Sequence, residues 1–533
     1  MKMQMPEIPE EDLKNPTVNM LVEMLWNCFR TIQELSDQVA QLKDEIAKLK
    51  GQKPRPKLPS SKTANDAKNN SGSNNSAKRT IDHEKREKIE RILKPDNIPD
   101  GSIFKGYEDY YVQDLIIKSQ EIRLRLAIYI APDGSRVRGK IPEEYRLGHF
   151  GINLIAYCLS QYYQCHVTEP LLLIQLHDVG IDISSAQLSN ILIKNKEVFH
   201  QEKQEILKAG LAHSAYLNTD DTGARHDGEN GYCTAIGSPL FTYFESTESK
   251  SRVNFLEILQ GTQKAYTLTE ESLNYAFEQG IRLKTLAILE KHENKQFKDK
   301  NTWISFLTKN NVITAKDQKI ATEAALLGGA FENGFNPSLI VISDGAGQFI
   351  LTLHGLCWVH AERHYRKLIP VSEDERIEIE KVRSDIWDYY EELKKYKKDP
   401  KISRQEELSK LFDDIFSKAY KSSILNDLLA RTRSRKDELL LVLKYPFIPL
   451  HNNDSERDIR EYVKRRKISG STRSKEGRQA RDTFTSLKKT CMKLKMCFYD
   501  YLKDRLYKTR KIPKLADLIK QKSMNLSYSL PTK

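Results

Sequence analysis

The sequence is short of the features that define secreted and membrane proteins. It has only seven cysteines in 533 residues, an odd number, and no C-x-x-C pair, which excludes a disulfide framework. Its densest apolar runs, at residues 152–159 and 171–174, fall far short of the ~20 residues that a membrane helix needs. The first residues carry Asp and Glu and lack the apolar core of a signal peptide. We therefore expect a cytoplasmic protein with free thiols and no membrane partner.

An excess of basic charge is also missing from most of the chain. Residues 1–455 contain 63 Lys and Arg against 65 Asp and Glu, whereas residues 456–533 contain 23 against 8. The net charge of +13 therefore arises entirely in the C-terminal part. Such a local excess favours a polyanionic partner, most commonly nucleic acid, and predicts association with the nucleoid. A basic surface that only improves solubility is the alternative.

The N-terminal part is predicted to contain a coiled coil and a linker. Apolar residues alternate three and four positions apart over residues 18–49, which indicates a coiled-coil helix within residues 1–50 and a homo-oligomer formed through it. A single amphipathic helix packed on its own domain is the alternative. Residues 51–80 are rich in Lys, Pro, Ser and Asn, a composition typical of a flexible linker, here a basic one.

A small β-rich unit is predicted next, over residues 81–148. Residues 110–117 and 122–130 are rich in β-branched and aromatic side chains, which favours strands. A Pro-Asp-Gly turn follows at residues 132–134. The pattern therefore predicts strands joined by tight turns in this segment.

Residues 149–210 are predicted to be helical, with a helix-turn-helix-like DNA-binding region. Thr168 and Pro170 mark the start of one helix, Gly180 breaks it, and residues 182–184 open a second helix. In a helix-turn-helix the second helix enters the major groove with its N-terminal polar side chains facing base edges. The predicted base readers are Ser185, Gln187 and Asn190. Two short helices in an ordinary α-rich domain are the alternative.

Three acidic positions stand where their side chains can converge. Asp220 and Asp221 end a strand-like run, which two further strand candidates follow in a predicted antiparallel meander. Asp344 ends a continuous apolar run, typical of a strand buried on both faces, at the end where open α/β sheets bind ligands. Glu456 falls in the first turns of a predicted helix. Taken singly, each acid also fits a plain role in a turn or at a helix start.

Converging carboxylates need a cation between them. Two carboxylates about 4 Å apart repel by roughly 4 kcal/mol at an effective dielectric of 20. Ligand sets made only of oxygen favour Mg²⁺ or Mn²⁺ over zinc, and two such ions can activate an attacking oxygen and stabilise a leaving one at a phosphodiester. Convergence of Asp220, Asp344 and Glu456 thus predicts a site for two Mg²⁺ or Mn²⁺ ions.

A dense basic segment follows Glu456. Eight cations stand within the 18 residues 464–481. Next to a metal-carboxylate site, this density suits a DNA phosphate backbone held against the reaction centre, whereas a solvated charged surface is the alternative. The residues predicted to bind DNA in this part of the chain are Arg457, Arg460, Lys464, Arg465, Arg466, Lys467 and Arg473.

Four motifs, taken in order, resemble those of one enzyme family. They are Asp220-Asp221-Thr222, Ser343-Asp344-Gly345-x-Gly347, Cys357-Trp358-x-His360-Ala361-x-Arg363 and Asn452-Asn453-x-x-Glu456-Arg457-x-x-Arg460. Over roughly residues 150–510 the chain is similar to DDE-type transposases of the insertion sequence 66 family. Carried over position by position, the resemblance implies that the catalytic and metal-binding triad is Asp220, Asp344 and Glu456.

The resemblance also implies a fold, and the chain departs from the family at two points. It implies an RNase H-like catalytic core over residues 211–510 with helical insertions at about 265–335 and 365–445. Many members have Glu at the position of Asp221, so the first ligand is left open between Asp220 and Asp221. The family's cysteine-rich zinc module is missing, because the chain has no C-x-x-C pair.

Together these predictions describe a multidomain α/β protein with α-rich parts, ending in a basic tail at residues 511–533. We expect a DNA transposase that cuts and joins phosphodiesters at insertion-sequence ends by two-metal-ion catalysis. Its expected partner is double-stranded DNA, as element ends and as target, and the need for accessory proteins is left open. The alternatives are an RNase H-like nuclease that hydrolyses without joining strands, and an inactive DNA-binding derivative, against which the intact Asp, Asp and Glu set argues.

Overall fold

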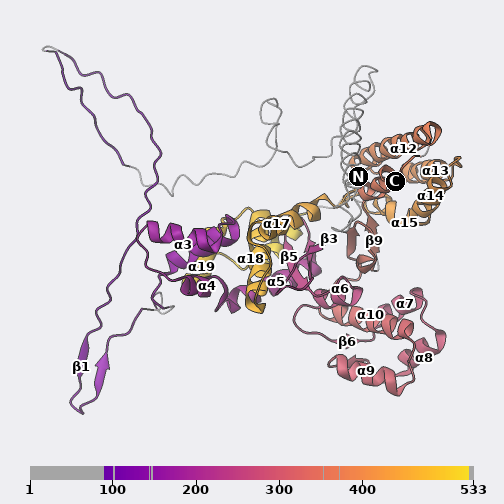
Figure 1. The fold of residues 1–533 in the computed structure, drawn as a ribbon, viewed down its shortest axis with the longest axis horizontal. Helices are drawn as coiled ribbons and strands as arrows, with labels where there is room; N and C mark the ends of the chain where they lie inside the picture. Colours follow the sequence, from indigo (N-terminus) through magenta and orange to yellow (C-terminus); the bar gives the residue numbers. More distant parts are fainter. Residues whose placement is uncertain are drawn as a thin grey trace, which may run out of the picture. The chain divides into compact units, whose positions relative to one another are not determined.

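The computed structural model describes residues 89–526 except 100–101, 143–144, 146–147, 352 and 371. Within this part the chain divides into a smaller unit, residues 361–435, and a larger unit, residues 89–360 and 436–526 (Figure 1). The predicted coiled coil and linker lie outside the described residues. In the described ranges, no helix is both long enough and apolar enough to cross a membrane.

A five-stranded mixed sheet forms the centre of the larger unit. Its strands, in the order in which they pair, are β5 (Thr242–Thr247), β4 (Tyr232–Gly237), β3 (Tyr216–Gly223), β8 (Ile340–Ser343) and β9 (Leu353–Leu356). The first three strands form an antiparallel meander, whereas β3, β8 and β9 run parallel. The predicted meander and the predicted buried strand are both observed, and the mixed α/β class is confirmed.

Helices flank this sheet (Figure 1). They are α5 (Glu197–His213), α17 (Asn453–Ser469) and α18 (Lys475–Lys493). Tyr462 of α17 belongs to a small apolar cluster with residues of β4 and β5. Along the edge strand β5, Ser486 accepts the N–H of Phe244 at 2.9 Å and Thr490 accepts that of Thr242 at 3.2 Å. Side chains of α18 thus satisfy backbone groups that an edge strand otherwise leaves open.

A helical layer of the same unit is built from both ends of the described chain. α2 (Ile152–Leu159) continues into a π-helical turn at Ser160–Gln164, and α3 (Glu169–Asp178) and α4 (Ser185–Ile193) follow. α19 (Phe498–Tyr507) packs on α2, and α20 (Leu515–Met524) packs on α5. Gly180, between α3 and α4, has φ +80°, a left-handed conformation that glycine adopts without strain. The predicted pair of helices interrupted at Gly180 is therefore observed.

Between β5 and β8 the chain forms a helical insertion. Its elements are α6 (Arg252–Leu259), β6 (Tyr266–Thr267), α7 (Glu270–Glu278), α8 (Leu283–Lys291), β7 (Gln296–Phe297), α9 (Lys300–Lys309) and α10 (Ala315–Glu332). Trp303 is fully buried at its centre, stacked on Tyr266 and packed against Phe297 and Phe306. The insertion thus has an apolar core of its own and begins at Arg252, earlier than the predicted residue 265.

The smaller unit is helical, and its three complete helices fall within the predicted range 365–445. α11 (Trp358–Arg366) leads into it, and α12 (Glu373–Lys398), α13 (Ile402–Phe416) and α14 (Ser423–Ser434) complete it. Tyr389 on α12 donates to the carbonyl of Leu408 at 2.9 Å. α15 (Lys436–Leu439) and α16 (Leu441–Lys444) then belong to the larger unit.

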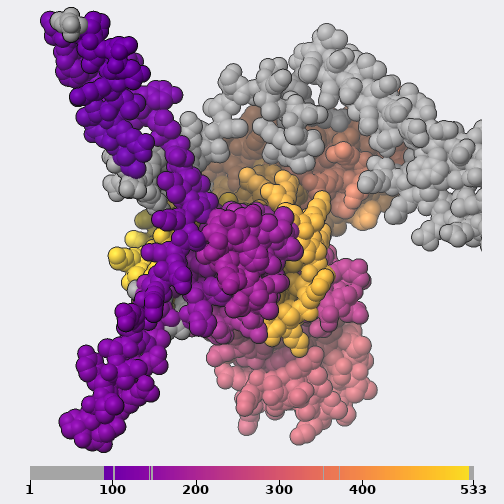
Figure 2. Space-filling model, turned by 60° about the vertical axis from the view of Figure 1, so that its left-hand side comes forward, coloured from indigo at the N-terminus to yellow at the C-terminus, as the bar shows by residue number. Residues whose placement is uncertain are grey.

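Residues 102–142 contain fewer strands than the sequence predicts. Within this segment only β1 (Ile128–Ile130) and β2 (Arg136–Arg138) pair, and residues 110–117 form no strand. Tyr110 is 91% exposed, and Figure 2 draws the segment, in indigo, as a narrow arm. Strand propensity alone is insufficient here, because a lone two-stranded hairpin is marginal without an apolar surface to pack on.

Candidate active site

Two of the predicted acidic residues lie on neighbouring strands at one edge of the sheet. β3 and β8 run parallel, with Asn218 opposite Ile342. Two residues further along each segment come Asp220, on β3, and Asp344, directly after β8. Because the carboxyl ends of parallel strands meet at the same edge, the sheet brings together two carboxylates that are far apart in the sequence.

Asn452 joins the helix that carries Glu456 to the same strand. Its side-chain amide donates to the carbonyl of Thr219 at 2.7 Å, and its Oδ1 accepts from Asn218 at 2.8 Å. Asn452 is fully buried, and a buried amide with satisfied partners holds its neighbours in one arrangement. Glu456 lies one turn along α17, where its Oε1 is 3.5 Å from Nε2 of His360.

Negative charge is concentrated around Asp220. Burial raises the pKa of Asp220 to about 7, and neighbouring carboxylates are further causes. These are Asp344, Asp221 and Glu456. Asp220 accepts the N–H of Asp221 at 2.8 Å, but neither Asp220 nor Asp344 takes part in an ion pair within the described part of the chain. The fold therefore gathers carboxylates here and leaves those of Asp220 and Asp344 without an ion pair among the described residues.

Asp221, the alternative first ligand, points to the opposite face of β3, because successive strand side chains alternate. There it forms an ion pair with Lys250 and accepts from Nε2 of Gln348 at 2.7 Å. The Lys250 ammonium also lies 5.2 Å from the centre of the Tyr232 ring. Since Asp221 is neutralised and hydrogen-bonded, Asp220 is the better placed of the two to take a ligand.

The donor set suits Mg²⁺ by its chemistry. In the described residues, no three His, Cys, Asp or Glu side chains are grouped closely enough to hold a metal ion by themselves. Mg²⁺ is commonly bound by one or two carboxylates together with substrate phosphates and waters. Asp220 and Asp344 would supply that share of oxygen ligands, and Glu456 lies within electrostatic reach of Asp220.

The predicted DNA-binding residues near α17 divide by exposure. Arg457, Arg460, Lys464, Lys467 and Arg473 are exposed. Arg465 is only 3% exposed: its guanidinium lies 3.7 Å from the centre of the Tyr162 ring and donates to the Tyr162 carbonyl at 2.7 Å. This placement speaks against a phosphate contact by Arg465. Arg465 instead links α17 to the π-helical turn after α2 through these contacts.

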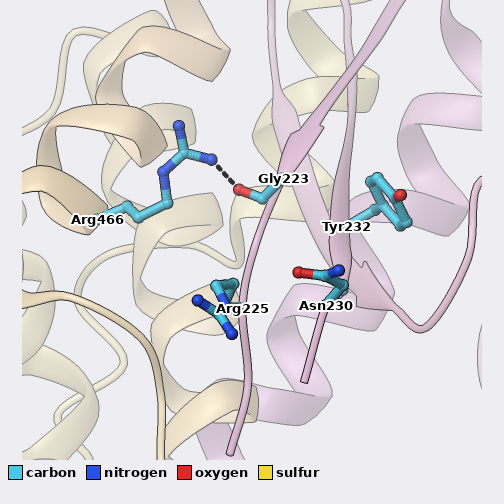
Figure 3. Close-up of a pocket in the computed structure, with 6 residues that line it drawn as sticks. Gly223, Arg225, Asn230, Tyr232 and Arg466 are labelled. Carbon is cyan, nitrogen blue, oxygen red and sulfur yellow. Dashed lines mark hydrogen bonds between the residues drawn. The ribbon is translucent and has the colours of Figure 1, made fainter. Parts of the chain in front are cut away.

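Arg466 lines a cavity at the far end of β3 (Figure 3). Its guanidinium donates to the carbonyl of Gly223 and to Oγ1 of Thr222 at 3.3 Å. The cavity has a volume of about 230 Å³. The other residues that line it are Arg225, Asn230, Gly231 and Tyr232. Arg225 and Arg466 lie on the same side of β3 in Figure 3, away from the Tyr232 ring. Two guanidiniums on one side suit an anionic oxygen such as that of a phosphate.

One backbone and one side-chain hydrogen bond hold the wall of this cavity in place. The N–H of Asp227 donates to the carbonyl of Thr472 at 2.8 Å, and Nδ1 of His226 is 2.9 Å from Oγ1 of Thr472. A Cβ at Gly231 would lie 2.6 Å from the Ala224 carbonyl oxygen, so this close approach of the two strands requires glycine. The β3–β4 turn and the loop after α17 are therefore fastened together, which brings the loops that carry Arg225 and Arg473 side by side.

The three predicted base readers are exposed on α4. Oγ of Ser184 accepts the N–H of Gln187 at 3.2 Å, and Oε1 of Gln187 accepts the N–H of Ser184 at 2.9 Å. This capping box occupies one polar atom of Gln187. The side chains of Ser185 and Asn190 form no hydrogen bond with another described residue, so they are the freer pair.

Sequence reasoning does not find Lys250, Gln348 or Arg225 in this region. Lys250 and Arg225 lie in loops, and Gln348 lies in the short 3₁₀ helix Gly347–Phe349, all outside the recognised motifs. The only signal is the place of Gln348 four residues after Asp344, and that spacing does not predict its partner. Their roles become visible only through the contacts that the tertiary structure creates.

Comparison with known proteins adds a second line of evidence. The model of a family described as "Transposase IS66 family" matches residues 342–480, a range that includes Asp344 and Glu456. The chain is also 40% identical over 303 residues to "Uncharacterized protein y4jO" of Sinorhizobium fredii, a match that covers 56% of this chain and 94% of the relative. The name of that relative states no activity.

Proposed function

This chain belongs to the transposase IS66 family, and on that premise we propose that it is a DNA transposase that cuts and joins phosphodiesters at the ends of an insertion sequence. The observation that carries the proposal is the carboxylate edge of the sheet. Asp220 is half-buried beside other carboxylates, with its pKa raised to about 7 by burial and their charge. A purely structural role accounts poorly for Asp220 and Asp344, because neighbouring carboxylates without an ion pair destabilise a fold.

The proposed catalytic and metal-binding residues are Asp220, Asp344 and Glu456, in an RNase H-like core. They would hold two Mg²⁺ or Mn²⁺ ions, which supply activation of the attacking oxygen and stabilisation of the leaving oxygen at a phosphodiester. Asp220 and Asp344 contribute from the sheet edge. Glu456 contributes from α17, whose position the buried Asn452 maintains, and His360 orients the Glu456 carboxylate.

In the proposed reaction, water cuts a phosphodiester at the element end, and the freed 3′-hydroxyl then attacks a phosphodiester of the target in line. The same three carboxylates serve both steps, because in each an oxygen attacks a phosphodiester. The protein's contribution is to position the two strands and the attacking oxygen. No side chain forms a covalent bond to DNA.

The DNA backbone would run from the carboxylates toward Arg466, Arg225 and Arg473. Gly223, whose carbonyl binds Arg466, is three residues beyond Asp220, or about 10 Å along a strand. That distance corresponds to about three base-pair steps of a duplex at roughly 3.4 Å each. Contacts of this kind position the DNA without reading its sequence, so we assign base reading to Ser185, Gln187 and Asn190 on α4.

We propose further that the protein acts as a homo-oligomer through the predicted coiled coil at residues 18–49. Light scattering of the full chain and of a chain without its first 55 residues tests this point. Removal of the first 55 residues should convert the oligomer into a monomer. Equal subunit numbers for the two chains would exclude this segment as the oligomerisation element.

The proposed function is tested with a linear DNA that carries the sequences flanking the gene, including any inverted repeats. In Mg²⁺ the wild-type chain should cut at the repeats and join the 3′ ends to a second, labelled duplex. Asp344→Asn should do neither while still binding the DNA. Cutting without joining would favour the nuclease. A folded chain that binds DNA but never cuts it would favour the inactive derivative.

A further inference from the structure

The loop that carries Asp344 is anchored at two consecutive residues. The carbonyl of Gly347 accepts two hydrogen bonds from Arg252, one from Nη2 at 2.6 Å and one from Nε at 3.1 Å. The next residue, Gln348, donates to Asp221 at 2.7 Å. These bonds hold the chain three and four residues after Asp344.

A third anchor follows, and it comes from the same helix as Arg252. Arg252 is the first residue of α6, and Phe255, one turn further, packs edge-to-face on the buried Phe349 with ring centres 5.0 Å apart. In the other direction, Nη1 of Arg252 lies 2.9 Å from Oη of Tyr275 on α7 and 3.3 Å from Oε2 of Glu323 on α10. One guanidinium therefore joins three helices of the insertion to the Asp344 loop.

The environment of Arg252 favours a fixed position. Its side chain is 18% exposed, and that of Glu323 is 2% exposed, so the buried carboxylate needs a charged partner. The planar guanidinium carries five donors in a rigid arrangement, which lets it bind a carboxylate and a carbonyl at once. A lysine ammonium is a point charge on a flexible stem and does not reproduce this geometry.

From these contacts we infer that the helical insertion between β5 and β8 supports the Asp344 loop, and that Arg252 is a positioning residue for the metal site. The inference rests on the proposed function, because it treats Asp344 as a metal ligand. Arg252 forms no bond to a carboxylate of the site and acts through the Gly347 backbone. Residues that orient metal ligands in this indirect way typically change metal affinity by about 10- to 100-fold when they are replaced.

The test measures Mn²⁺ binding to the full chain by electron paramagnetic resonance, without DNA. Arg252→Ala should weaken binding by about 10- to 100-fold. The matched control is Arg282→Ala. Arg282 forms the same kind of pair in the same insertion, with Nε 2.5 Å from Oδ2 of the buried Asp317, but it does not contact the Asp344 loop. The control should bind Mn²⁺ like the wild type, although both variants lose an ion pair to a buried acid.

The outcomes separate this inference from the proposed function. Arg252→Ala binding as tightly as the wild type, while Asp344→Asn does not bind, overturns the inference alone. Asp344→Asn binding like the wild type overturns both. Equal weakening by Arg252→Ala and Arg282→Ala also overturns the inference, because general destabilisation then accounts for the loss. Should Arg252→Ala not fold, the comparison of Arg252→Lys with Arg282→Lys replaces it. Arg252→Lys should then bind Mn²⁺ more weakly than Arg282→Lys, and equal binding by the two variants would overturn the inference.

Discussion

The two faces of β3 carry neighbouring aspartates in opposite electrostatic settings. On one face, Asp220 lies among carboxylates and its pKa is raised to about 7, first by burial. On the other face, Asp221 pairs with Lys250 and accepts from Gln348. The fold thus leaves Asp220 without an ion pair and neutralises Asp221, although the two residues are of the same type and adjacent in the sequence. The difference distinguishes a carboxylate that can take a ligand from one that holds the structure together.

The same division recurs between Arg465 and Arg466 on α17. Arg465 is buried and stacks on Tyr162, whereas Arg466 lines the cavity at the end of β3. In each pair, one residue has a structural contact (Asp221, Arg465) and its neighbour is placed to meet a ligand (Asp220, Arg466). Each pair therefore offers a test in which one variant is the control for its neighbour.

The largest expected difference is between Asp220→Asn and Asp221→Asn in strand cleavage. Loss of a catalytic carboxylate should slow cutting by about a thousandfold or more. Asp221→Asn keeps the size of the side chain and a hydrogen-bonding oxygen, so we expect a smaller loss of about 10- to 100-fold, as for a residue that orients ligands. Single-turnover cleavage of end-labelled DNA measures both. The reverse order of effects would move the first ligand to Asp221.

The second comparison concerns the stability of the metal-free chain against pH. The pKa of Asp220 is about 7 in the folded state and 3.8 ordinarily, so the folded state binds more protons between these values. Stability should therefore fall as pH rises from about 4 to about 7, with the full cost present above pH 7. Asp220→Asn should remove this part of the pH dependence of the melting temperature, and Asp221→Asn should leave most of it, because burial raises the pKa of Asp220 more than the charge of Asp221 does.

Adding Mg²⁺ at pH 8 sharpens this test. The ion should raise the melting temperature of the wild type and of Asp221→Asn, because binding to the folded state alone stabilises it. It should have little effect on Asp220→Asn. A pH profile that is identical in the wild type and in Asp220→Asn would show that the Asp220 carboxyl is not perturbed.

Arg465→Met and Arg466→Met should separate stability from DNA binding. Arg465→Met leaves the Tyr162 carbonyl without its donor, so it should lower the free energy of unfolding by about 1–3 kcal/mol. Arg466→Met should lower stability less, because water can replace its donation to the exposed Gly223 carbonyl. It should flatten the plot of log affinity against log salt by about 0.9 for duplex DNA. Denaturant titration and fluorescence anisotropy measure the two quantities. The double variant should also flatten the plot by about 0.9, since only one phosphate contact is lost; a change of about 1.8 would assign a contact to Arg465 as well.

Variants of α4 are expected to have the smallest effect on sequence-independent DNA binding. Asn190→Ala should weaken binding to the cognate end by roughly 1–3 kcal/mol if its amide reads a base, and it should spare binding to unrelated DNA. Competition with unrelated duplex measures the ratio of the affinity for the cognate end to the affinity for unrelated DNA. Gln187→Ala also removes part of the capping box, so it should lower helix stability in addition. An unchanged ratio in Asn190→Ala would exclude that residue as a base reader.

Much of the fold could be predicted because the signals were local. The apolar run before Asp344 predicted a buried strand, and β8 is buried along its whole length. The turns between the strands after Asp220 predicted the meander, and the polar residues before Glu456 predicted the start of α17. Local patterns gave a wrong prediction at residues 110–117, because strand propensity does not produce a strand where no apolar surface is available for packing.

The sequence by itself determined which residues stand at strand ends and helix starts, because turn chemistry, capping and apolar periodicity act over a few residues. It also determined that Asp220 and Asp221 point to opposite faces. Only the tertiary structure decided which face α17 covers, that Arg465 is buried, and that Arg252 reaches Gly347. The physical reason is that burial and charge pairing depend on segments far apart in the sequence, and no local pattern specifies which of them will meet.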